Sequence, residues 1–538
     1  MRMKHFVLEC IFITLFIASC SCSGQTTTEP VPHGNGEDTS YVPQPEENPF
    51  PEYEPPEIDT SSFTQENIPV NFTTVNDFHG QIDEEADDKR VGLAKMAKYL
   101  RNRKSKGDVL ISNGDMYQGS YLCSVDKGQF VSYSFKYLGF DAYVLGNHEF
   151  DWDLHPLLDN QAAIGENFLC ANLYSYPKKN VAWQKANLGE KYKIINLYEG
   201  TPFEVKIGII GVIGKSQISS INSQYTTDYI FLDPTDIVKD IAVDLRDNKK
   251  CDFVIASYHD AEPDESIAST AKNKSYKYVD ACFMAHTHKY EHRVINGVPF
   301  VQASAYSRGV STINFSFNKK KHTNELTYSG YTYLADKGLL PDSIVDQKIN
   351  EKKSKYRSEY ETIIGTNEVE DLDYGKMSQF YAKISFDQAV TTNKEHPIVG
   401  CMFNESRRGL KTGEFTYSDL FETHPFLNGL YIMSVTEQDI NNEKKYSYGY
   451  INPEARIGNS TSRRWDILVF DYNGFHIGID KDYNKYYNYF PSAFAKNAPY
   501  EPIKLDFTCL DVALKYLEIY GTITDSFFET EGLYYRTA

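Results

Sequence analysis

Val70 to Val75 reads VNFTTV and leads directly into Asn76-Asp-Phe-His79. The β-branched and aromatic residues of this run predict a strand, and the strand ends in side chains that can bind a metal ion. An apolar run followed by such side chains recurs four more times, at Ser112-Asn-Gly-Asp115, Leu145-Gly-Asn-His-Glu-Phe-Asp151, Ser257-Tyr-His-Asp260 and Met284-Ala-His-Thr-His288. The interpretation of the whole chain depends on these five segments.

Short apolar runs alternate with helical stretches between residues 67 and 335. The expected strands are Val70–Val75, Val109–Ser112, Tyr143–Leu145, Phe168–Ala171, Lys206–Val212, Phe253–Ser257 and Ala281–Met284. Between the first two, Leu93, Met96 and Leu100 repeat at helical spacing. The alternation predicts a layered α/β domain, with β-sheets flanked by helices and a substantially parallel sheet. In such sheets ligands bind beyond the carboxyl ends of the strands, where all five segments fall.

The side chains of these segments suit divalent metal ions. Five of the 13 histidines of the chain lie in them, beside carboxylates and a carboxamide, and none of the segments contains cysteine. That mixture favours two oxygen-preferring cations around a phosphoryl group over one structural zinc ion. Asp77 and His79 are two residues apart, so both face one side of an extended segment and can share a cation, and His286 and His288 repeat this spacing. For any one segment alone, hydrogen-bonded turn residues are the alternative.

The order and spacing of the segments resemble the calcineurin-like metallophosphoesterases, in the branch of the 5′-nucleotidases and 2′,3′-cyclic phosphodiesterases. Gly146-Asn-His-Glu-Phe-Asp151 matches the family's motif residue for residue. Asn113-Gly-Asp-Met-Tyr-Gln-Gly-Ser120 and Val301-Gln-Ala-Ser-Ala-Tyr306 resemble two further segments of that branch. Ala285 departs from the pattern, because the family usually has glycine before the first histidine of the pair.

The resemblance implies a role for each of these side chains. Metal one would be held by Asp77, His79 and His288, metal two by Asn147, His259 and His286, and Asp115 would bridge the two ions. His148 would not be a ligand. It would face the phosphoryl group, oriented by Asp151, and stabilise the negative charge there. The two ions would be divalent, with Mn, Zn, Mg and Co as candidates, and a metal-activated water would attack phosphorus.

A smaller mixed α/β domain is expected over residues 372–538, after a polar connecting helix at 336–371. Gly413 to Asn428 resembles the C-terminal 5′-nucleotidase domain, which implies that Phe426 stacks on a base and Asn428 binds ribose. Arg407 falls at the position of an arginine of that domain, and Tyr472 or Phe475 would be the second stacking ring. The sequence departs from the domain's pattern at Glu405-Ser406, at Leu427 and at Ile479-Asp-Lys-Asp482.

The N-terminal residues predict export from the cytoplasm. Residues 1–19 are typical of a lipoprotein signal peptide, and Ile17-Ala-Ser-Cys20 resembles a bacterial lipobox whose cysteine is lipidated. An ordinary cleavable signal is the alternative. Residues 20–66 are rich in proline and poor in aliphatic side chains, which predicts an extended tether. The catalytic domain, residues 67–335, would then lie outside the cytoplasm, with the lipid at Cys20 as its membrane anchor.

The composition bears on possible partners. The net charge of −19 argues against polymeric nucleic acid, whose binding needs a basic footprint. A small phosphate ester is acceptable, because bound cations reverse the local field. The six cysteines after residue 22 are scattered, which favours buried single thiols and leaves a disulfide open.

The expected function is therefore metal-dependent hydrolysis of a nucleotide, as in a 5′-nucleotidase, or of a related small phosphate ester. A 2′,3′-cyclic phosphodiesterase or a UDP-sugar hydrolase would use the same site. A non-catalytic surface-binding lipoprotein is a further alternative, although all seven ligand positions hold competent residues. A single-zinc amidohydrolase also uses His-x-His, but it would not account for Asn147 or for the pair His148 and Asp151. The identity of the metals and the oligomeric state are left open.

Overall fold

The computed structural model describes residues 41–175, 184–185, 188–221, 225, 229–260, 262–403, 406–426, 429–470, 477–479, 486–488 and 502–537. The signal peptide and the lipidation site predicted at Cys20 lie outside the described residues. Within the described ranges, no helix has the length and apolar character that crossing a membrane requires.

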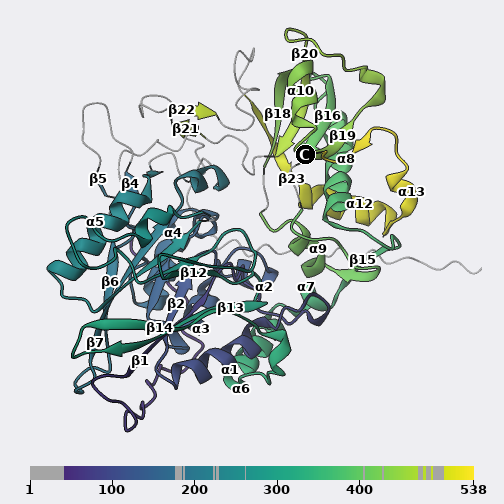
Figure 1. Cartoon of the computed structure of the whole chain (residues 1–538). Helices are drawn as coiled ribbons and strands as arrows, with labels where there is room; N and C mark the ends of the chain where they lie inside the picture. Colours follow the sequence, from purple (N-terminus) through teal and green to yellow (C-terminus); the bar gives the residue numbers. More distant parts are fainter. Residues whose placement is uncertain are drawn as a thin grey trace, which may run out of the picture. The chain divides into compact units, whose positions relative to one another are not determined.

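Two mixed sheets with parallel strands at their centres form the N-terminal domain (Figure 1). The first sheet has the order β14 (Thr323–Tyr333), β13 (Gly309–Asn318), β1 (Ile68–Val75), β2 (Val109–Asn113) and β3 (Ala142–Val144). The second has the order β11 (Glu291–Ile295), β12 (Val298–Gln302), β10 (Ala281–Met284), β9 (Phe253–His259), β7 (Val205–Ile213) and β6 (Tyr192–Leu197). β1 to β3 run parallel, as do β12, β10, β9 and β7. The expected parallel core is present, and it is divided between two sheets.

The two sheets pack face to face, and helices cover their outer faces. Phe72 of β1 and Phe253 of β9 meet between the sheets, with ring centroids 6.3 Å apart. The next residue, Val254, joins the cluster beneath α5 (Pro234–Asp247), because successive side chains of a strand point to opposite faces. The helices over the first sheet are α1 (Gly92–Lys104), α3 (Gln129–Tyr137) and α4 (Leu154–Ile164). The predicted layered α/β class is confirmed.

Most of the expected strands are present, with ends shifted by a few residues. Phe168–Ala171 is the exception, because this buried segment forms isolated bridges at Leu169 instead of a ladder. Three successive N–H groups of the segment donate to the carbonyls of Tyr143 (2.7 Å), Glu190 (2.9 Å) and Gly211 (2.7 Å). The segment thus bonds to a different neighbour at each residue, which an apolar run alone does not reveal.

The connecting segment is a broken helix. α6 (Ser343–Lys355) and α7 (Arg357–Glu361) meet at Tyr356, and strand β15 (Ile363–Asn367) follows. Val345 and Ile349 of α6 are buried, and α6 packs beside α1 (Figure 1). One face of this charged helix therefore belongs to the N-terminal core, which differs from the purely polar connection expected from its composition.

The C-terminal domain is mixed α/β. Its main sheet has the order β23 (Ile503–Thr508), β18 (Gly429–Thr436), β20 (Arg464–Phe470), β16 (Ile398–Phe403), β19 (Tyr448–Ile451) and β25 (Leu533–Tyr534). α8 (Tyr374–Thr392) and α12 (Cys509–Tyr520) pack together on one core with this sheet. β17 (Gly413–Thr416) and β24 (Thr522–Ile523) pair with β15, and α9 (Tyr417–Thr423) leads to Phe426.

The remaining helices and strands are short. The helices are α2 (Tyr121–Ser124), α10 (Glu437–Glu443) and α13 (Asp525–Phe528). The strands are β4 (Leu173–Ser175), β5 (Gln184–Lys185), β8 (Tyr229–Phe231), β21 (Ile477–Ile479) and β22 (Tyr486–Asn488). The six cysteines of the two domains are all buried, as the sequence favours.

Residues 42–66, from the second half of the predicted tether, lie against the N-terminal domain. Phe50 is 5% exposed, and its ring centroid lies 5.1 Å from that of Phe130 and 5.5 Å from that of Tyr137. The backbone N–H of Gln44 donates to Asp159 Oδ1 (2.8 Å). Part of the predicted tether therefore packs against the N-terminal domain through aromatic side chains such as Phe50, which the overall composition of the segment does not show.

Candidate metal centre

The seven predicted ligands all lie at the carboxyl ends of parallel strands. In the first sheet Asp77 and His79 follow β1, Asp115 follows β2, and Asn147 follows β3. In the second sheet His259 ends β9, and His286 and His288 follow β10. The side chains from the two sheets are within hydrogen-bonding distance of one another. The site therefore lies at the strand ends that the two sheets share, as expected for this class of fold.

The backbone at five of these residues is in the left-handed region. φ is 49° at Asp77, 50° at His79, 57° at Asp115, 79° at His286 and 59° at His288. Each such non-glycine residue costs about 1–3 kcal/mol, and such conformations persist only where the surrounding structure imposes them. Here the Asp77 N–H donates to Gly114 O (3.0 Å) and the His79 N–H to Asp115 O (2.9 Å). This concentration of strained residues is typical of a functional site.

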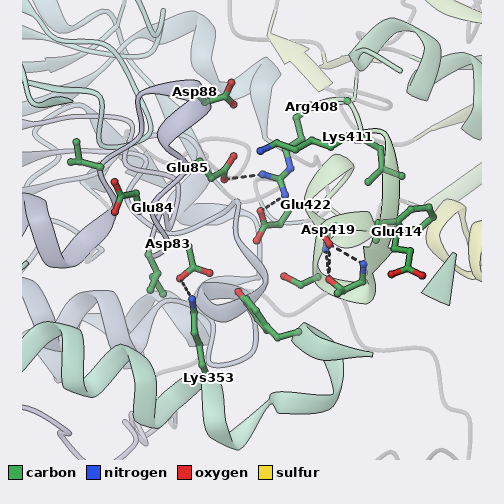
Figure 2. Close-up of a pocket in the computed structure, with 18 of the residues that line it drawn as sticks. Asp83, Glu84, Glu85, Asp88, Lys353, Arg408, Lys411, Glu414, Asp419 and Glu422 are labelled. Atoms are coloured by element: carbon green, nitrogen blue, oxygen red, sulfur yellow. Dashed lines mark hydrogen bonds and ion pairs between the residues drawn. The ribbon is translucent and has the colours of Figure 1, made fainter. Parts of the chain in front are cut away.

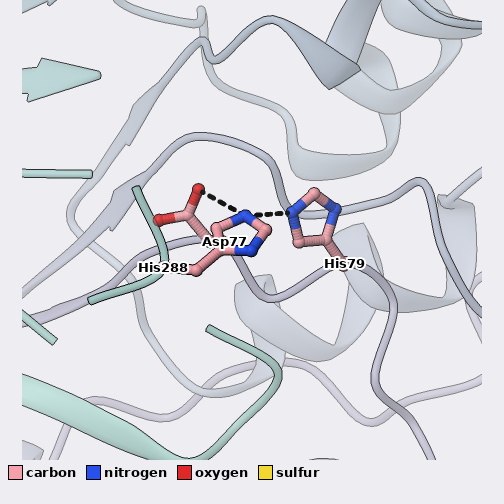
Figure 3. Close-up of side chains that lie close together, drawn as sticks. All are labelled: Asp77, His79 and His288. Carbon is pink, nitrogen blue, oxygen red and sulfur yellow. Dashed lines mark hydrogen bonds and ion pairs between the residues drawn. The ribbon is translucent and has the colours of Figure 1, made fainter. Parts of the chain in front are cut away.

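The first ligand group consists of Asp77, His79 and His288 (Figure 3). His79 Nε2 lies 3.0 Å from His288 Nε2, which in turn lies 3.5 Å from Asp77 Oδ1. Asn76 Nδ2 (2.6 Å) and the backbone N–H of His286 (3.0 Å) both donate to Asp77 Oδ2 and orient the carboxylate. Two imidazole nitrogens and a carboxylate oxygen thus converge on one point.

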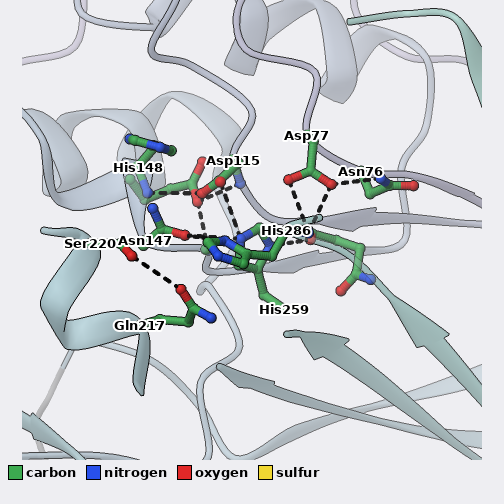
Figure 4. Close-up of polar contacts among 12 residues, drawn as sticks. Asn76, Asp77, Asp115, Asn147, His148, Gln217, Ser220, His259 and His286 are labelled. Carbon is green, nitrogen blue, oxygen red and sulfur yellow. Dashed lines mark hydrogen bonds and ion pairs between the residues drawn. The ribbon is translucent and has the colours of Figure 1, made fainter. Parts of the chain in front are cut away.

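The second group consists of Asp115, His259 and His286, with Asn147 beside them (Figure 4). His259 Nε2 lies 3.1 Å from Asp115 Oδ2. Asn147 Oδ1 lies 3.2 Å from His259 Nε2 and 3.1 Å from His286 Nδ1. The carboxamide therefore presents its oxygen to both imidazoles, which is the orientation of a metal ligand.

Asp115 lies between the two groups. Its Oδ2 is 3.1 Å from His259 Nε2 in the second group and 4.0 Å from His79 Nε2 in the first. Gly114 allows this close approach, because its φ is +82° and a Cβ there would lie 2.5 Å from His259 Nδ1. One carboxylate oxygen thus faces an imidazole nitrogen of each group.

Backbone carbonyls orient two of the imidazole rings. His79 Nδ1 lies 2.8 Å from Gln118 O, and His259 Nδ1 lies 2.9 Å from Asn113 O. When Nδ1–H donates to a carbonyl, Nε2 is left to bind a metal ion, which is the usual arrangement of a histidine ligand. Tyr306 adds a ring contact to His79, with centroids 5.0 Å apart. These contacts fix the orientation of both rings.

Burial and neighbouring charges set the protonation of the cluster. Burial lowers the pKa of His286 to about 4 and the pKa values of His79 and His288 well below the usual value. These three imidazoles are therefore neutral, which is the form that binds metals. Burial also opposes the charge of His259, but the adjacent Asp115 outweighs it and raises the pKa of His259 to about 10. A cation bound between Asp115 and His259 has to displace that proton.

The donor set fits two divalent ions. Two buried carboxylates, one amide oxygen and four imidazoles are hard and borderline ligands, which first-row divalent metals and Mg²⁺ accept. The two groups lie on either side of one shared carboxylate, whereas a single structural zinc ion takes four ligands in a closed tetrahedron. The residues present thus match the pair of ions that the sequence predicts.

His148 and Asp151 form a separate pair beside the ligands. His148 Nδ1 lies 2.6 Å from Asp151 Oδ2, and the backbone N–H of His148 donates to Asp115 Oδ1 (2.8 Å). Asp151 is not the N-cap of α4, because the Asp153 side chain accepts the N–H of Leu154 in that role. His148 belongs to neither ligand group.

Two predicted substrate-binding residues reach this histidine from the C-terminal domain. Arg407 Nη2 lies 2.6 Å from His148 Nε2. The ring of Phe426 stacks on His148, with centroids 5.4 Å apart and planes at 25°, and the Arg407 guanidinium lies 4.6 Å from the Phe426 centroid. Of the other residues predicted to bind substrate, Asn428, Tyr472 and Phe475 lie outside the described residues.

Glu149 is a residue of the site to which the sequence assigned no role. Its Oε2 accepts the N–H groups of Asp115 (2.8 Å) and Gly146 (2.6 Å), and its Oε1 accepts that of Met116 (2.7 Å). One buried carboxylate thus joins the loop of Asp115 to the loop of Asn147. The position of Glu149 inside the Gly-Asn-His-Glu motif could have indicated a role in the site. The motif alone does not show which groups the carboxylate contacts.

The fold and the site together define the calcineurin-like phosphoesterase class. The family described as calcineurin-like phosphoesterase matches residues 70–290, from β1 to the residues after His288. This part of the chain is therefore a calcineurin-like phosphoesterase domain. Over a longer stretch, the chain is similar in sequence to apyrases and 5′-nucleotidases.

Three comparisons show what the chain is similar to beyond this domain. The chain is 24% identical over 487 residues to the endonuclease YhcR of Bacillus subtilis, covering 82% of this chain and 38% of the relative. It is 27% identical over 313 residues to the 5′-nucleotidase of Rattus norvegicus, covering 52% of this chain and 51% of the relative. The crystal structure of a 5′-nucleotidase precursor from Thermus thermophilus superposes with a TM-score of 0.67 at 15% identity, covering 85% of this chain and 97% of that one. The chain thus spans about half or less of these two curated relatives, and the solved structure supports the fold of both domains.

Proposed function

We propose that the chain is a phosphohydrolase that uses two divalent metal ions to hydrolyse nucleotides or related small phosphate esters. The observation that carries the proposal is the arrangement of two ligand groups around Asp115, with the pair His148 and Asp151 next to them. A structural metal site needs no such pair. A general acid or charge stabiliser beside two cations suits phosphoryl transfer.

The ligands divide between the two ions as the resemblance implies. Asp77, His79 and His288 would hold metal one, and Asn147, His259 and His286 would hold metal two. Asp115 would bridge them. When bound, such ions neutralise charge on the phosphoryl oxygens and lower the pKa of water. Mn, Zn, Mg and Co remain the candidate metals.

His148 and Arg407 would act on the substrate's phosphoryl group. Asp151 fixes one nitrogen of the His148 ring, so Nε2 faces the site, where the Arg407 guanidinium now contacts it. A phosphoryl oxygen placed between them can accept hydrogen bonds from both side chains. Such donors stabilise the charge that develops on the transferred group or on the leaving oxygen.

A nucleotide is the favoured substrate. Phe426 presents an aromatic ring beside His148, and base stacking on such a ring is independent of base identity. The 5′-nucleotidase relative supports a nucleoside monophosphate. A 2′,3′-cyclic nucleotide and a UDP-sugar are alternatives on the same metals. The endonuclease relative raises polymeric nucleic acid as a substrate, but the net charge of −19 opposes it.

We also propose that the protein acts outside the cytoplasm. The apolar run before Ile17-Ala-Ser-Cys20 supports export and a lipid at Cys20. Cys20→Ala should release the mature protein from the membrane fraction or block its processing. A variant that stays anchored and matures normally would exclude lipidation at Cys20.

A metal-supplemented hydrolysis screen tests the proposed activity. The metal-stripped protein is loaded with Mn²⁺, Zn²⁺, Mg²⁺ or Co²⁺ and offered nucleoside monophosphates, 2′,3′-cyclic nucleotides, UDP-sugars, single-stranded DNA and simple aryl phosphates. The proposal predicts metal-dependent phosphate release, fastest from a nucleotide, and its loss in Asp115→Ala. Hydrolysis of DNA alone would move the substrate class to polymers, and no hydrolysis with any metal would reject the proposal.

A further inference from the structure

Arg408, the residue after Arg407, takes part in two ion pairs that cross the boundary between the domains. Its Nη1 lies 2.8 Å from Glu85 Oε1 in the N-terminal domain, and its Nη2 lies 2.8 Å from Glu422 Oε2 in the C-terminal domain. Figure 2 shows the guanidinium between the two carboxylates. We refer to Glu85, Arg408 and Glu422 as the clasp.

The clasp is shielded from water. The Arg408 side chain is 21% exposed, and those of Glu85 and Glu422 are 17% and 14% exposed. A second ion pair between the domains, Lys411 with Asp87, is comparably short at 2.9 Å, but its side chains are 76% and 82% exposed. Exposed pairs contribute little because water and salt screen them, whereas the loss of one partner from a buried pair leaves an uncompensated charge.

Acidic side chains predominate around the clasp. A cavity of about 810 Å³ lies beside it, lined by eleven acidic and four basic side chains from the two domains and the connecting helices. Among the four basic side chains, Arg408 is the most buried. The acidic side chains on the two sides of the domain boundary repel each other. Arg408 is the cation placed best to offset this repulsion and to hold the two domain surfaces together.

The clasp is joined to the catalytic residues through short connections. Arg407 precedes Arg408 and contacts His148. Glu422 also accepts the N–H of Tyr121 (3.3 Å), and it lies four residues before Phe426. Between them, Pro425 O accepts Gln118 Nε2 (2.8 Å), while Gln118 O lies 2.8 Å from His79 Nδ1. Arg408 is thus connected, through the chain and through Glu422, to both C-terminal residues that touch His148.

We propose that Arg408 is a positioning residue, which bridges Glu85 and Glu422 so that Arg407 and Phe426 of the C-terminal domain are held against His148. The inference rests on the proposed function, because it concerns residues of the same site. It adds a residue that lies outside both ligand groups and acts through its neighbour in the chain.

A kinetic cycle tests whether Arg408 acts through Arg407. Arg407→Ala should lower kcat/KM by about a hundredfold, the scale for one lost transition-state donor, and Arg408→Ala by about tenfold. In the Arg407→Ala background, Arg408→Ala should have no further effect, because sites that act as one unit are not additive. Lys411→Ala is the matched control and should leave kcat/KM unchanged. Arg408→Lys, which keeps the charge, should retain part of the activity. Additive effects, or equal effects of Arg408→Ala and Lys411→Ala, would overturn the proposal.

Hydrogen exchange on the metal-loaded full chain tests the same geometry without an activity assay. In Arg408→Ala and Glu422→Gln, exchange should rise by about tenfold in peptides that contain Tyr121 or Phe421–Phe426, while strands β7 and β9 and the metal content stay unchanged. Lys411→Ala should change neither peptide. Unchanged exchange in both clasp variants would reject the clasp even in an active enzyme. If the protein hydrolyses no phosphate ester, the proposed function fails, and the exchange result still decides whether the clasp exists.

Discussion

Glu149 should control metal affinity although it binds no metal. Its carboxylate accepts the N–H groups of Asp115, Met116 and Gly146 at 2.6–2.8 Å and is 4% exposed. In Glu149→Gln only the carbonyl oxygen remains an acceptor, and the NH₂ group has to face at least one of these N–H donors. The variant therefore loses at least one hydrogen bond to a charged group, about 1.5–3 kcal/mol, and leaves a buried donor unsatisfied.

That energy is lost at the two loops that position Asp115 and Asn147. Groups that orient metal ligands typically change metal affinity by about 10–100-fold when removed, which corresponds to ~1.4–2.8 kcal/mol and agrees with the lost hydrogen bond. Burial and the charge of Asp115 raise the pKa of Glu149 to about 7. The carboxyl is thus ionised at pH 8.5, where the difference between the wild-type protein and Glu149→Gln should be largest. At pH 6 the wild-type Glu149 carboxyl is protonated and, like the amide of Glu149→Gln, carries a hydrogen-bond donor. The difference in metal affinity between the two proteins should therefore be smaller at pH 6.

Titration calorimetry with Mn²⁺ on chelator-treated protein measures this effect. Glu149→Gln should weaken binding by about 10–100-fold at pH 8.5 and by less at pH 6. Glu437→Gln is the control, because Glu437 also accepts a backbone N–H, that of Ser460 (3.0 Å), but lies in the C-terminal domain. It should bind Mn²⁺ like wild type. Wild-type affinity of Glu149→Gln at pH 8.5 would refute the reasoning.

Three further predictions concern the same site. His148→Ala should lower kcat by roughly a hundredfold or more while metal analysis still finds two ions, and loss of an ion would make His148 a ligand. Metal binding at pH 7 should release about one proton, because the pKa of His259 is raised to about 10. The metal affinity should therefore rise with pH. Calorimetry in two buffers of different ionisation enthalpy measures the proton release, and its absence would contradict the assignment of His259 as a ligand. Phe426→Ala should lower kcat/KM for a nucleoside monophosphate by about 5–150-fold and spare a small aliphatic phosphate ester. Equal losses on both substrates would make Phe426 a core residue.

The sequence could predict the candidate metal centre because each segment that contributes to it has a recognisable local pattern. Each ligand directly follows an apolar run, and parallel strands bring their carboxyl ends together. The Asp77 and His288 segments therefore could be expected to meet although they are far apart in the chain. The pairing of His148 with Asp151 was implied by the resemblance alone, because the spacing of the two residues does not show that their side chains meet.

Contacts made by single side chains over long distances could not be predicted. Phe50 is the clearest case, because a proline-rich segment gave no sign that one ring would be buried beside Phe130. Arg408 is another, since its partners Glu85 and Glu422 are ordinary charged residues in sequence. Phe168–Ala171 has a strand-like composition, but its hydrogen bonds go to three different neighbours. Composition and periodicity indicate which residues are buried, but they do not show which other residues those side chains contact.

The metal content of purified variants tests the central claim most directly. After stripping and reloading with Mn²⁺, wild-type protein should contain two ions per chain. Asp115→Ala, which removes the carboxylate oxygen that faces both His79 and His259, should contain fewer and hydrolyse no phosphate ester above background. His148→Ala should retain both ions. A wild-type content of one ion, or two ions and full turnover in Asp115→Ala, would contradict a binuclear centre bridged by Asp115.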